Sequence, residues 1–387
     1  MLRSLLSVGY RPFFLFCAVN AFAWMLRWLT LLSGDGAPTQ GWPPSTLHAH
    51  EMIYGTAVAA IAGFLLTAVP NWTDTRRITG ARLAGLVALW LLGRAALVLS
   101  DHLDPLFVAF VDVPFLPVLA HALARPILRS GKWHNYPVVG VLVGLAFANG
   151  AIHIGLLQSK PLMLRAGTYG AVYLVVMLML VISGRVVPLF TRNALRRRGI
   201  DAPVVTNRIV AGAAVGSATA VLALDLLDPG DRLAAWISLL AGPLLLARQS
   251  GWQLRRVLGD PMLWILHLGH AWLALGFAAY GASSFWGHFF GAGAIHAFTA
   301  GAMGTLILGM MPRVALGHSG RAIEASMGTR VMFVLVLVGA LVRVVGAIGV
   351  PAFYSTSLLA GGFLWAAAWL VFCVLYAKIL VVPPELA

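Results

Sequence analysis

The sequence predicts an all-α protein, a polytopic integral membrane helix bundle. Of its 387 residues, 60% are hydrophobic and only 10% are charged, whereas soluble domains carry about 25% charged residues. No soluble fold could bury so much apolar surface, because too little polar surface would remain to face water. The apolar residues also gather in separate runs of roughly the 20 residues that a helix needs to cross a bilayer. We therefore expect residues 1–387 to form a single membrane domain in a lipid bilayer.

Twelve apolar runs are long enough to be transmembrane helices. They lie near residues 12–32, 48–70, 82–100, 106–126, 137–157, 164–190, 209–226, 232–248, 261–281, 288–311, 328–348 and 355–379. The second, sixth and tenth runs each end with a proline, which predicts that the helix stops there. These endings indicate either a threefold repeat of four helices or simply the effect of proline, which interrupts helices.

The basic residues are distributed unevenly between the two sides of this helix arrangement. With twelve spans, 20 lysines and arginines fall on the side of the N-terminus and 3 on the opposite side. Cytoplasmic loops carry an excess of Lys and Arg, so both termini are expected in the cytoplasm. The net charge of +14 arises from these loops, and no basic groove with interleaved aromatic residues is present. A nucleic-acid partner is therefore not expected.

Four histidines on three predicted helices share the layer opposite the termini, the outer layer. They are His48, His50, His153 and His296. Imidazole is the commonest transition-metal ligand, and it suits haem iron and copper better than calcium or magnesium. The shared depth predicts a metal site near the outer face. For each histidine taken singly, the alternative is a hydrogen bond that joins two helices.

His48 and His50 are two residues apart, which limits how they can act together. In a regular helix such residues point about 200° apart. They could bind one metal only if the helix start is irregular, so we favour separate roles. Glu51, directly after His50, is expected to deliver protons from the outer side during catalysis.

Two arginines within the spans have few acidic partners in the sequence. Arg94 and Arg343 lie in the outer parts of their helices, and the acids within the spans are Glu51 and Asp112. Haem propionates could supply the carboxylates that arginine pairs with in a forked geometry. Both arginines are therefore candidate cofactor-binding residues, and the alternative is that they extend toward lipid headgroups.

Five blocks spread along the chain resemble the NnrS family. They are "GYRPFF", "HAHEMIYGTAVAAIAGFLLTAVPNWT", "GRVVPLFTRN", "WILHLGHAWLALG" and "IHAFTAGAMGTLILGMMPRVALGHSGR". The resemblance implies a multi-pass protein of the bacterial inner (cytoplasmic) membrane that contains haem b and copper and relieves nitric oxide stress. It also implies a set of metal ligands, namely His48, His50, His267, His296, His318 and, more loosely, His153 in "NGAIHIGLL".

The chain departs from the family pattern at two positions. His270 stands where the family has tyrosine, and Pro312 stands where it has threonine. The first departure favours His267 over His270 as a ligand. The second could change how the tenth helix ends and where His318 points.

The leading functional hypothesis is a haem or haem–copper protein that acts on nitric oxide, as a reductase supplied by an unknown electron donor. Nitric oxide is small and apolar, so it could reach an outer-layer metal through the lipid. One alternative is a transporter whose histidines relay haem or copper from one side of the membrane to the other. Another is a sensor or sink that binds nitric oxide without turnover.

Overall fold

The computed structural model describes residues 2–36, 41–286, 288–348 and 353–383. The protein is 83% helical, and no strand occurs among the described residues. Within the same residues, 12 helical segments are long and apolar enough to cross a membrane. The predicted fold class and number of spans are therefore confirmed, while the cytoplasmic location of the termini stays a prediction.

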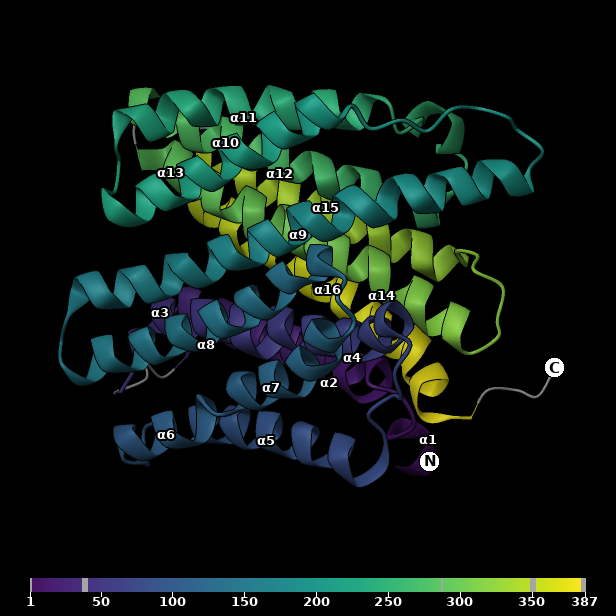
Figure 1. The fold of residues 1–387 in the computed structure, drawn as a ribbon. Helices are drawn as coiled ribbons and strands as arrows, with labels where there is room; N and C mark the ends of the chain where they lie inside the picture. Colours follow the sequence, from purple (N-terminus) through teal and green to yellow (C-terminus); the bar gives the residue numbers. More distant parts are fainter. Residues whose placement is uncertain (1, 37–40, 287, 349–352, 384–387) are drawn as a thin grey trace. The chain divides into compact units, whose positions relative to one another are not determined.

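Figure 1 shows the helices in chain order. The first half comprises α1 (Leu2–Leu5), α2 (Tyr10–Leu32), α3 (Pro44–His50), the π-helix η1 (Glu51–Ala57), α4 (Val58–Thr73), α5 (Gly80–Val98), α6 (Pro105–Asp112), α7 (Phe115–Arg129), the short 3₁₀ turn η2 (Trp133–Asn135), α8 (Tyr136–Leu157) and α9 (Pro161–Arg197). The second half comprises α10 (Arg208–Leu227), α11 (Arg232–Ser250), the 3₁₀ turn η3 (Leu254–Val257), α12 (Pro261–Trp286), α13 (His288–His296), the π-helix η4 (Ala297–Met303), α14 (Gly304–His318), α15 (Met327–Ile348) and α16 (Tyr354–Val381).

The chain forms two compact units. Unit 1 comprises residues 1–174, 314–322 and 372–387, and unit 2 comprises residues 175–313 and 323–371. The chain passes between the units within α9, α14 and α16, and again in the loop that follows α14. The single membrane domain expected from the sequence stays a prediction.

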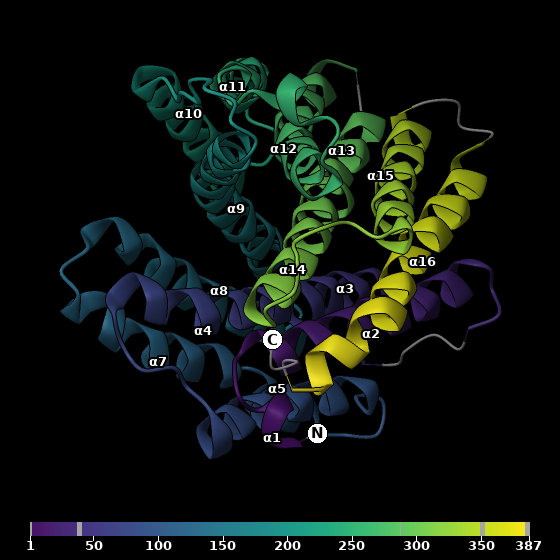
Figure 2. The ribbon, with the colours of Figure 1, turned by 90° about the vertical axis from the view of Figure 1, so that its right-hand side faces the viewer.

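In unit 1, a buried arginine joins the two ends of the chain. The side chain of Arg11, in the first turn of α2, is 1% exposed. Its Nη1 donates to the carbonyl oxygens of Leu380 at 2.9 Å and Val382 at 2.7 Å. These carbonyls lie at the end of α16, where a helix has no internal donors left for them. Figure 2 shows the end of α16 beside α1 and the start of α2.

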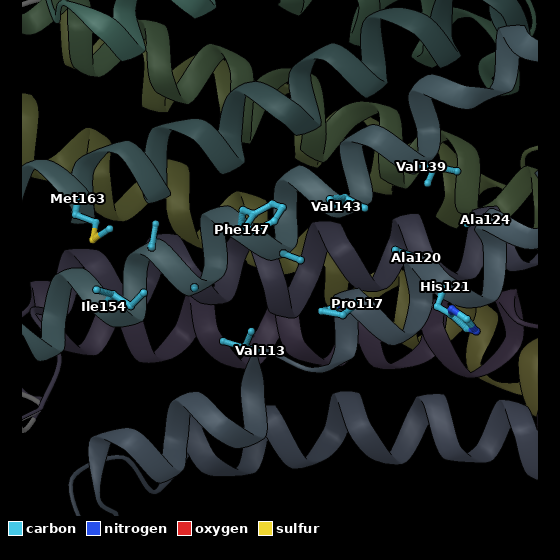
Figure 3. A pocket seen from close by; sticks show the side chains of 13 residues that line it. Val113, Pro117, Ala120, His121, Ala124, Val139, Val143, Phe147, Ile154 and Met163 are labelled. Atoms are coloured by element: carbon cyan, nitrogen blue, oxygen red, sulfur yellow. The ribbon is translucent and has the colours of Figure 1, made fainter. Parts of the chain in front are cut away.

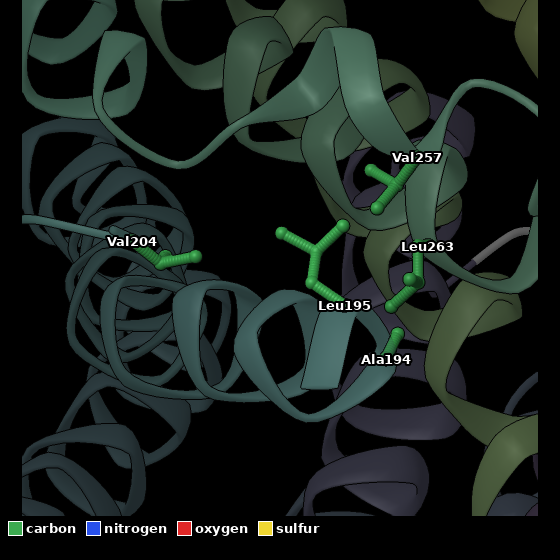
Figure 4. Packing of buried hydrophobic residues seen from close by; sticks show 5 residues of the cluster. All are labelled: Ala194, Leu195, Val204, Val257 and Leu263. Atoms are coloured by element: carbon green, nitrogen blue, oxygen red, sulfur yellow. The ribbon is translucent and has the colours of Figure 1, made fainter. Parts of the chain in front are cut away.

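In unit 2, α10, α11 and α12 pack side by side (Figure 2). Ser238 on α11 donates to the carbonyl oxygen of Phe277 on α12 at 2.7 Å, so the contact is also hydrogen-bonded. An apolar cluster packs the end of α9 against the segments that follow it (Figure 4). Its members are Ala194, Leu195, Val204, Val257 and Leu263.

Prolines do not end the second, sixth and tenth spans. Pro70, Pro188 and Pro312 lie inside helices that continue to Thr73, Arg197 and His318. The prediction that these prolines close their helices is therefore wrong. In membranes, neighbouring side chains and local adjustments of the helix can satisfy the backbone groups that proline frees, so a proline need not end the helix. His318 consequently belongs to the last turn of α14 instead of following it.

Candidate metal centre

Three side chains of unit 1 converge on one point inside the bundle. Nε2 of His153 lies 3.0 Å from Oδ2 of Asp112, and Nε2 of His50 lies 3.2 Å from the same oxygen. The three ligand atoms all lie within 4.8 Å of one another. Around a tetrahedral ion with bonds of about 2.1 Å, ligand atoms are about 3.4 Å apart. Small shifts would therefore let these atoms share one ion.

The carboxylate of this group sits where the fourth span is interrupted. Helix α6 ends at Asp112, Val113 and Pro114 form a turn, and α7 begins at Phe115 (Figure 1). Both turn residues keep helical dihedral angles, so the interruption is one in the hydrogen-bond pattern, where Pro114 has no N–H to donate. The interruption places an acidic side chain in the interior, where it is 3% exposed.

His50 also lies beside an irregular stretch of helix. The π-helix η1 begins directly after it. A π-helix has wider turns than an α-helix and occurs frequently at functional sites. Asn20 on α2 stabilises this turn by donating through Nδ2 to Glu51 O at 3.3 Å and to Thr56 Oγ1 at 3.2 Å. A Cβ on Gly55 would lie 2.3 Å from Asn20 Nδ2, so only glycine leaves room for this contact.

Arg94 on α5 joins the two carboxylates of the site. Its Nη1 donates to Glu51 Oε1 and its Nη2 donates to Asp112 Oδ1. Gly93 makes this approach feasible, because a Cβ there would lie 2.8 Å from Asp112 Oδ1. The sequence suggested that Arg94 pairs with haem propionates. In the structure its guanidinium pairs with two protein carboxylates instead.

The charged groups around His50 carry one negative charge that Arg94 does not balance. Its Nδ1 lies 3.2 Å from Glu51 Oε1, and its Nε2 lies 2.9 Å from Asn149 Oδ1. The amide of Asn149 is oriented by its Nδ2, which donates to Asp112 Oδ2 at 2.8 Å. Both ring nitrogens therefore face acceptor oxygens, and two carboxylates share one arginine. Either a proton or a metal ion can supply the missing charge.

A small cavity adjoins the candidate metal centre. Its volume of about 10 Å³ is close to the minimum that holds one water molecule. Its lining consists of Tyr54, Val58, Trp90, Arg94, Asp112, Phe115, Leu116 and Asn149. Trp42 covers the histidines, with ring centroids 5.1 Å from His50 and 5.3 Å from His153. The centre is thus enclosed by side chains, with room beside it for about one water-sized molecule.

The other predicted ligands of unit 1 lie apart from this cluster. His48 stacks on Trp28, with ring centroids 4.5 Å apart. The two histidines of "HAH" therefore have different neighbours, as the regular α3 requires. His318 stacks on Tyr10 at 5.7 Å.

In unit 2, both ring nitrogens of His267 are engaged. Gln249 Nε2 donates to His267 O at 2.8 Å and lies 3.3 Å from His267 Nδ1, which therefore accepts. Nε2 of His267 then carries the hydrogen that it donates to Thr191 Oγ1 at 3.0 Å. No nitrogen of this ring is left for a metal.

His270, one helical turn further along α12, has an open nitrogen. The hydroxyl of Ser183 donates to Met179 O at 2.5 Å, so its oxygen accepts from His270 Nδ1 at 2.9 Å. In neutral imidazole the lone pair is then on Nε2. This atom is buried and has no partner. A ring whose other nitrogen is held in this way is typical of metal-binding histidine.

The remaining candidates of unit 2 make local contacts. Nδ1 of His296 donates to Ala292 O at 2.8 Å. Arg343 is 9% exposed, lies over Tyr354 at 5.8 Å and has one buried nitrogen, Nη1, without a partner. These contacts do not indicate that either residue binds a metal or a cofactor.

Sequence reasoning missed Asp112, Asn149 and His270 as site residues. Asp112 had a signal, because an acid in an apolar run two residues before a proline is costly unless it has a partner. Asn149 precedes His153 by four residues and so shares its helix face. For His270, only the direction of the Ser183 hydrogen bonds separates it from His267.

Replacing Arg94 with methionine should destabilise unit 1 strongly. The change leaves two buried carboxylates without their cation, which typically costs about 3–5 kcal/mol. Thermal unfolding in detergent would measure the loss, with Arg82→Met on the exposed face of α5 as the matched control. Adding Glu51→Gln to Arg94→Met should restore part of the stability. Equal melting temperatures for the Arg94 and Arg82 variants would contradict this role.

Comparison with known proteins identifies a family for the chain. A family model described as NnrS protein matches residues 4–383. No curated protein matches the chain. The match covers nearly the whole chain, and on this basis the protein belongs to the NnrS family.

Proposed function

We propose that the protein binds nitric oxide at a transition-metal ion held by His50, Asp112 and His153, and reduces it with electrons from an external donor. Family membership supports a membrane protein of the nitric oxide response. The observation that carries the proposal is the buried group of two imidazoles and one carboxylate beside a cavity of about 10 Å³. We place this chemistry in the bacterial inner membrane, with both chain termini in the cytoplasm.

The donor set suits a small ion and does not fit haem at this position. Two imidazoles and a carboxylate favour copper, iron or zinc over calcium or magnesium. Three protein ligands within 4.8 Å leave no space for a porphyrin between them. Copper is the ion that the family resemblance implies, and it is redox-active, as electron transfer requires.

We assign a separate role to each side chain around the proposed ion. His50, Asp112 and His153 would hold the ion, which would supply a coordination position for nitric oxide and one-electron redox chemistry. Asn149 and Arg94 hold Asp112 in orientation through its two oxygens. Trp42 excludes water from the histidines. Glu51 Oε2 is buried without a partner, which suits it to hold a proton for the substrate. Converting two nitric oxide molecules to nitrous oxide and water consumes two electrons and two protons.

Metal analysis of the purified protein tests the centre directly. We expect about one copper per chain, and we expect His153→Ala or Asp112→Asn to weaken binding by more than about 100-fold, because losing a ligand exceeds the 10- to 100-fold effect of losing an outer-shell partner. His48→Ala is the control, because this residue lies on α3 outside the cluster. Equal metal content in all variants, or none in the wild type, would overturn the centre.

The Glu51→Gln variant tests the proton role. Because a positioned proton donor contributes about 10²–10⁴-fold to a rate, consumption of nitric oxide should fall within that range while the metal content stays unchanged. An electrode measurement with excess reductant gives the rate. Loss of the metal together with the activity would show that Glu51 is structural.

For haem b, the chain offers a different residue, His270. Its Nε2 is the open imidazole nitrogen that haem iron requires, and the Arg248 guanidinium lies 5.7 Å from Trp252, the ring that also contacts His270. Among the described residues Arg248 has no acidic partner, so it could pair with a propionate. The His270 ring is fully buried, so haem at this position would require neighbouring side chains to rearrange. We propose His270, rather than His267, as the haem ligand.

Absorption spectra separate these two histidines. His270→Ala should abolish the b-type pyridine haemochrome signal, and His270→Tyr should shift the Soret band because an oxygen replaces the imidazole nitrogen. His267→Ala should retain the wild-type haem content. The opposite pattern would assign the haem to His267.

Copper or haem trafficking is the second candidate, and one observation favours it. Transporter sites commonly form where a membrane helix is interrupted, as the fourth span is at Asp112. A trafficking protein would exchange its ion with a chelator, whereas a reductase would retain the ion through many turnovers. Radioactive copper exchange during nitric oxide consumption would distinguish the two.

A further inference from the structure

A long apolar groove runs along the seam between α7 and α8 in unit 1 (Figure 3). Its volume is about 640 Å³. It is lined by Val113, Pro117, Ala120, His121, Ala124, Val139, Val143, Ala146, Phe147, Gly150, Ala151, Ile154 and Met163. His121 is the one polar side chain among them. The lining includes none of His50, Asp112 and His153, so the groove is distinct from the candidate metal centre.

The dimensions of the groove match a lipid chain. Its lining extends from Val113, in the turn before α7, to Ala124 on α7, and from Val139 to Ile154 on α8. At 1.5 Å per residue these stretches are about 17 Å and 22 Å long. One leaflet of a bilayer contributes about 15 Å of hydrocarbon. The groove therefore spans the depth of a single acyl chain.

Basic residues continue the groove at one end. On α7, the groove residues Pro117 and His121 are followed at intervals of four residues by Arg125 and Arg129, which places all four on one ridge of the helix. Figure 3 shows His121 at the end of the groove away from Met163. Both arginines are exposed, and neither has an acidic partner in the part of the chain that the structure describes. Their charges are free to meet an anion.

Aromatic residues mark the same end as a membrane interface. Trp133 and Tyr136, at the start of α8, are 77% and 38% exposed. Such residues gather at the level of lipid headgroups. The apolar groove therefore begins where headgroups lie, beside two unpaired arginines.

We propose that this groove is a binding site for one anionic phospholipid. An acyl chain lies between α7 and α8, and the phosphate lies between Arg125 and Arg129. The occupant is a lipid and not a protein helix, because the groove combines the depth of one leaflet with a cationic end. Clusters of basic residues at this level of a membrane protein favour anionic lipids. The site does not depend on the metal chemistry proposed above.

Native mass spectrometry of the delipidated full-length protein tests the site. The probes are phosphatidylglycerol and, as the zwitterionic comparison, phosphatidylcholine with the same chains. Each basic residue near an anionic surface contributes a factor of about five, so two should favour phosphatidylglycerol by about 30-fold. Arg125→Gln with Arg129→Gln should remove this preference. The matched control is Arg196→Gln with Arg197→Gln, two exposed arginines at the end of α9.

A second variant tests the groove itself. A Cβ at Gly150 would meet no atom within 4 Å, so Gly150→Phe can fill the groove without disturbing the protein. This variant should lose both lipids while the melting temperature and metal content stay unchanged. Equal retention of the two lipids by the wild type would overturn the proposal, as would equal losses in the two arginine variants. A dimer that dissociates in Gly150→Phe would also overturn it, by showing that a second copy occupies the groove.

Discussion

The arrangement of unit 1 depends on the burial of two carboxylates at membrane depth. A charge without a partner in this environment is costly, and removing one partner of a buried pair leaves the other uncompensated. Arg94 contacts both Glu51 and Asp112 but balances only one of them. The remaining negative charge is directed at His50 and His153. A proton on an imidazole or a bound cation can balance this charge, and the second possibility is the physical basis for proposing an ion there.

Two irregular stretches of backbone bring these groups together. The π-helix after His50 and the break after Asp112 both occur in otherwise continuous spans. Each is stabilised by close contacts at glycine, with Gly55 against Asn20 and Gly93 against Asp112. A regular helix would carry the same residues at the same depth but would direct them elsewhere. The geometry of the centre therefore resides in departures from regular structure.

The sequence predicts the spans well and the site only in part, for reasons of scale. A span is visible as an average over about 20 residues, so local irregularities do not hide it. The depth of a residue along its helix follows from the same average. The predicted depths correctly placed His50 and His153 in one layer. The direction of a side chain around its helix does not follow from depth. His48 thus shares the layer of His50 but stacks on Trp28, and Asp112 enters the site through a break that hydropathy does not register. The prolines were misleading because a proline within a membrane helix does not necessarily end it, and these three helices continue past theirs.

The sequences around the two π-helices, one in each unit, are similar. Each occupies the seven residues that follow a histidine, His50 in one unit and His296 in the other. Glycine stands five and thirteen residues after each histidine, at Gly55 and Gly63 and again at Gly301 and Gly309. Helix α9 is α-helical throughout, so the likeness joins the second and tenth spans and does not extend to the sixth. The position after the histidine differs, because Ala297 stands where Glu51 follows His50. The same backbone device therefore presents a histidine with an acid in unit 1 and without one in unit 2.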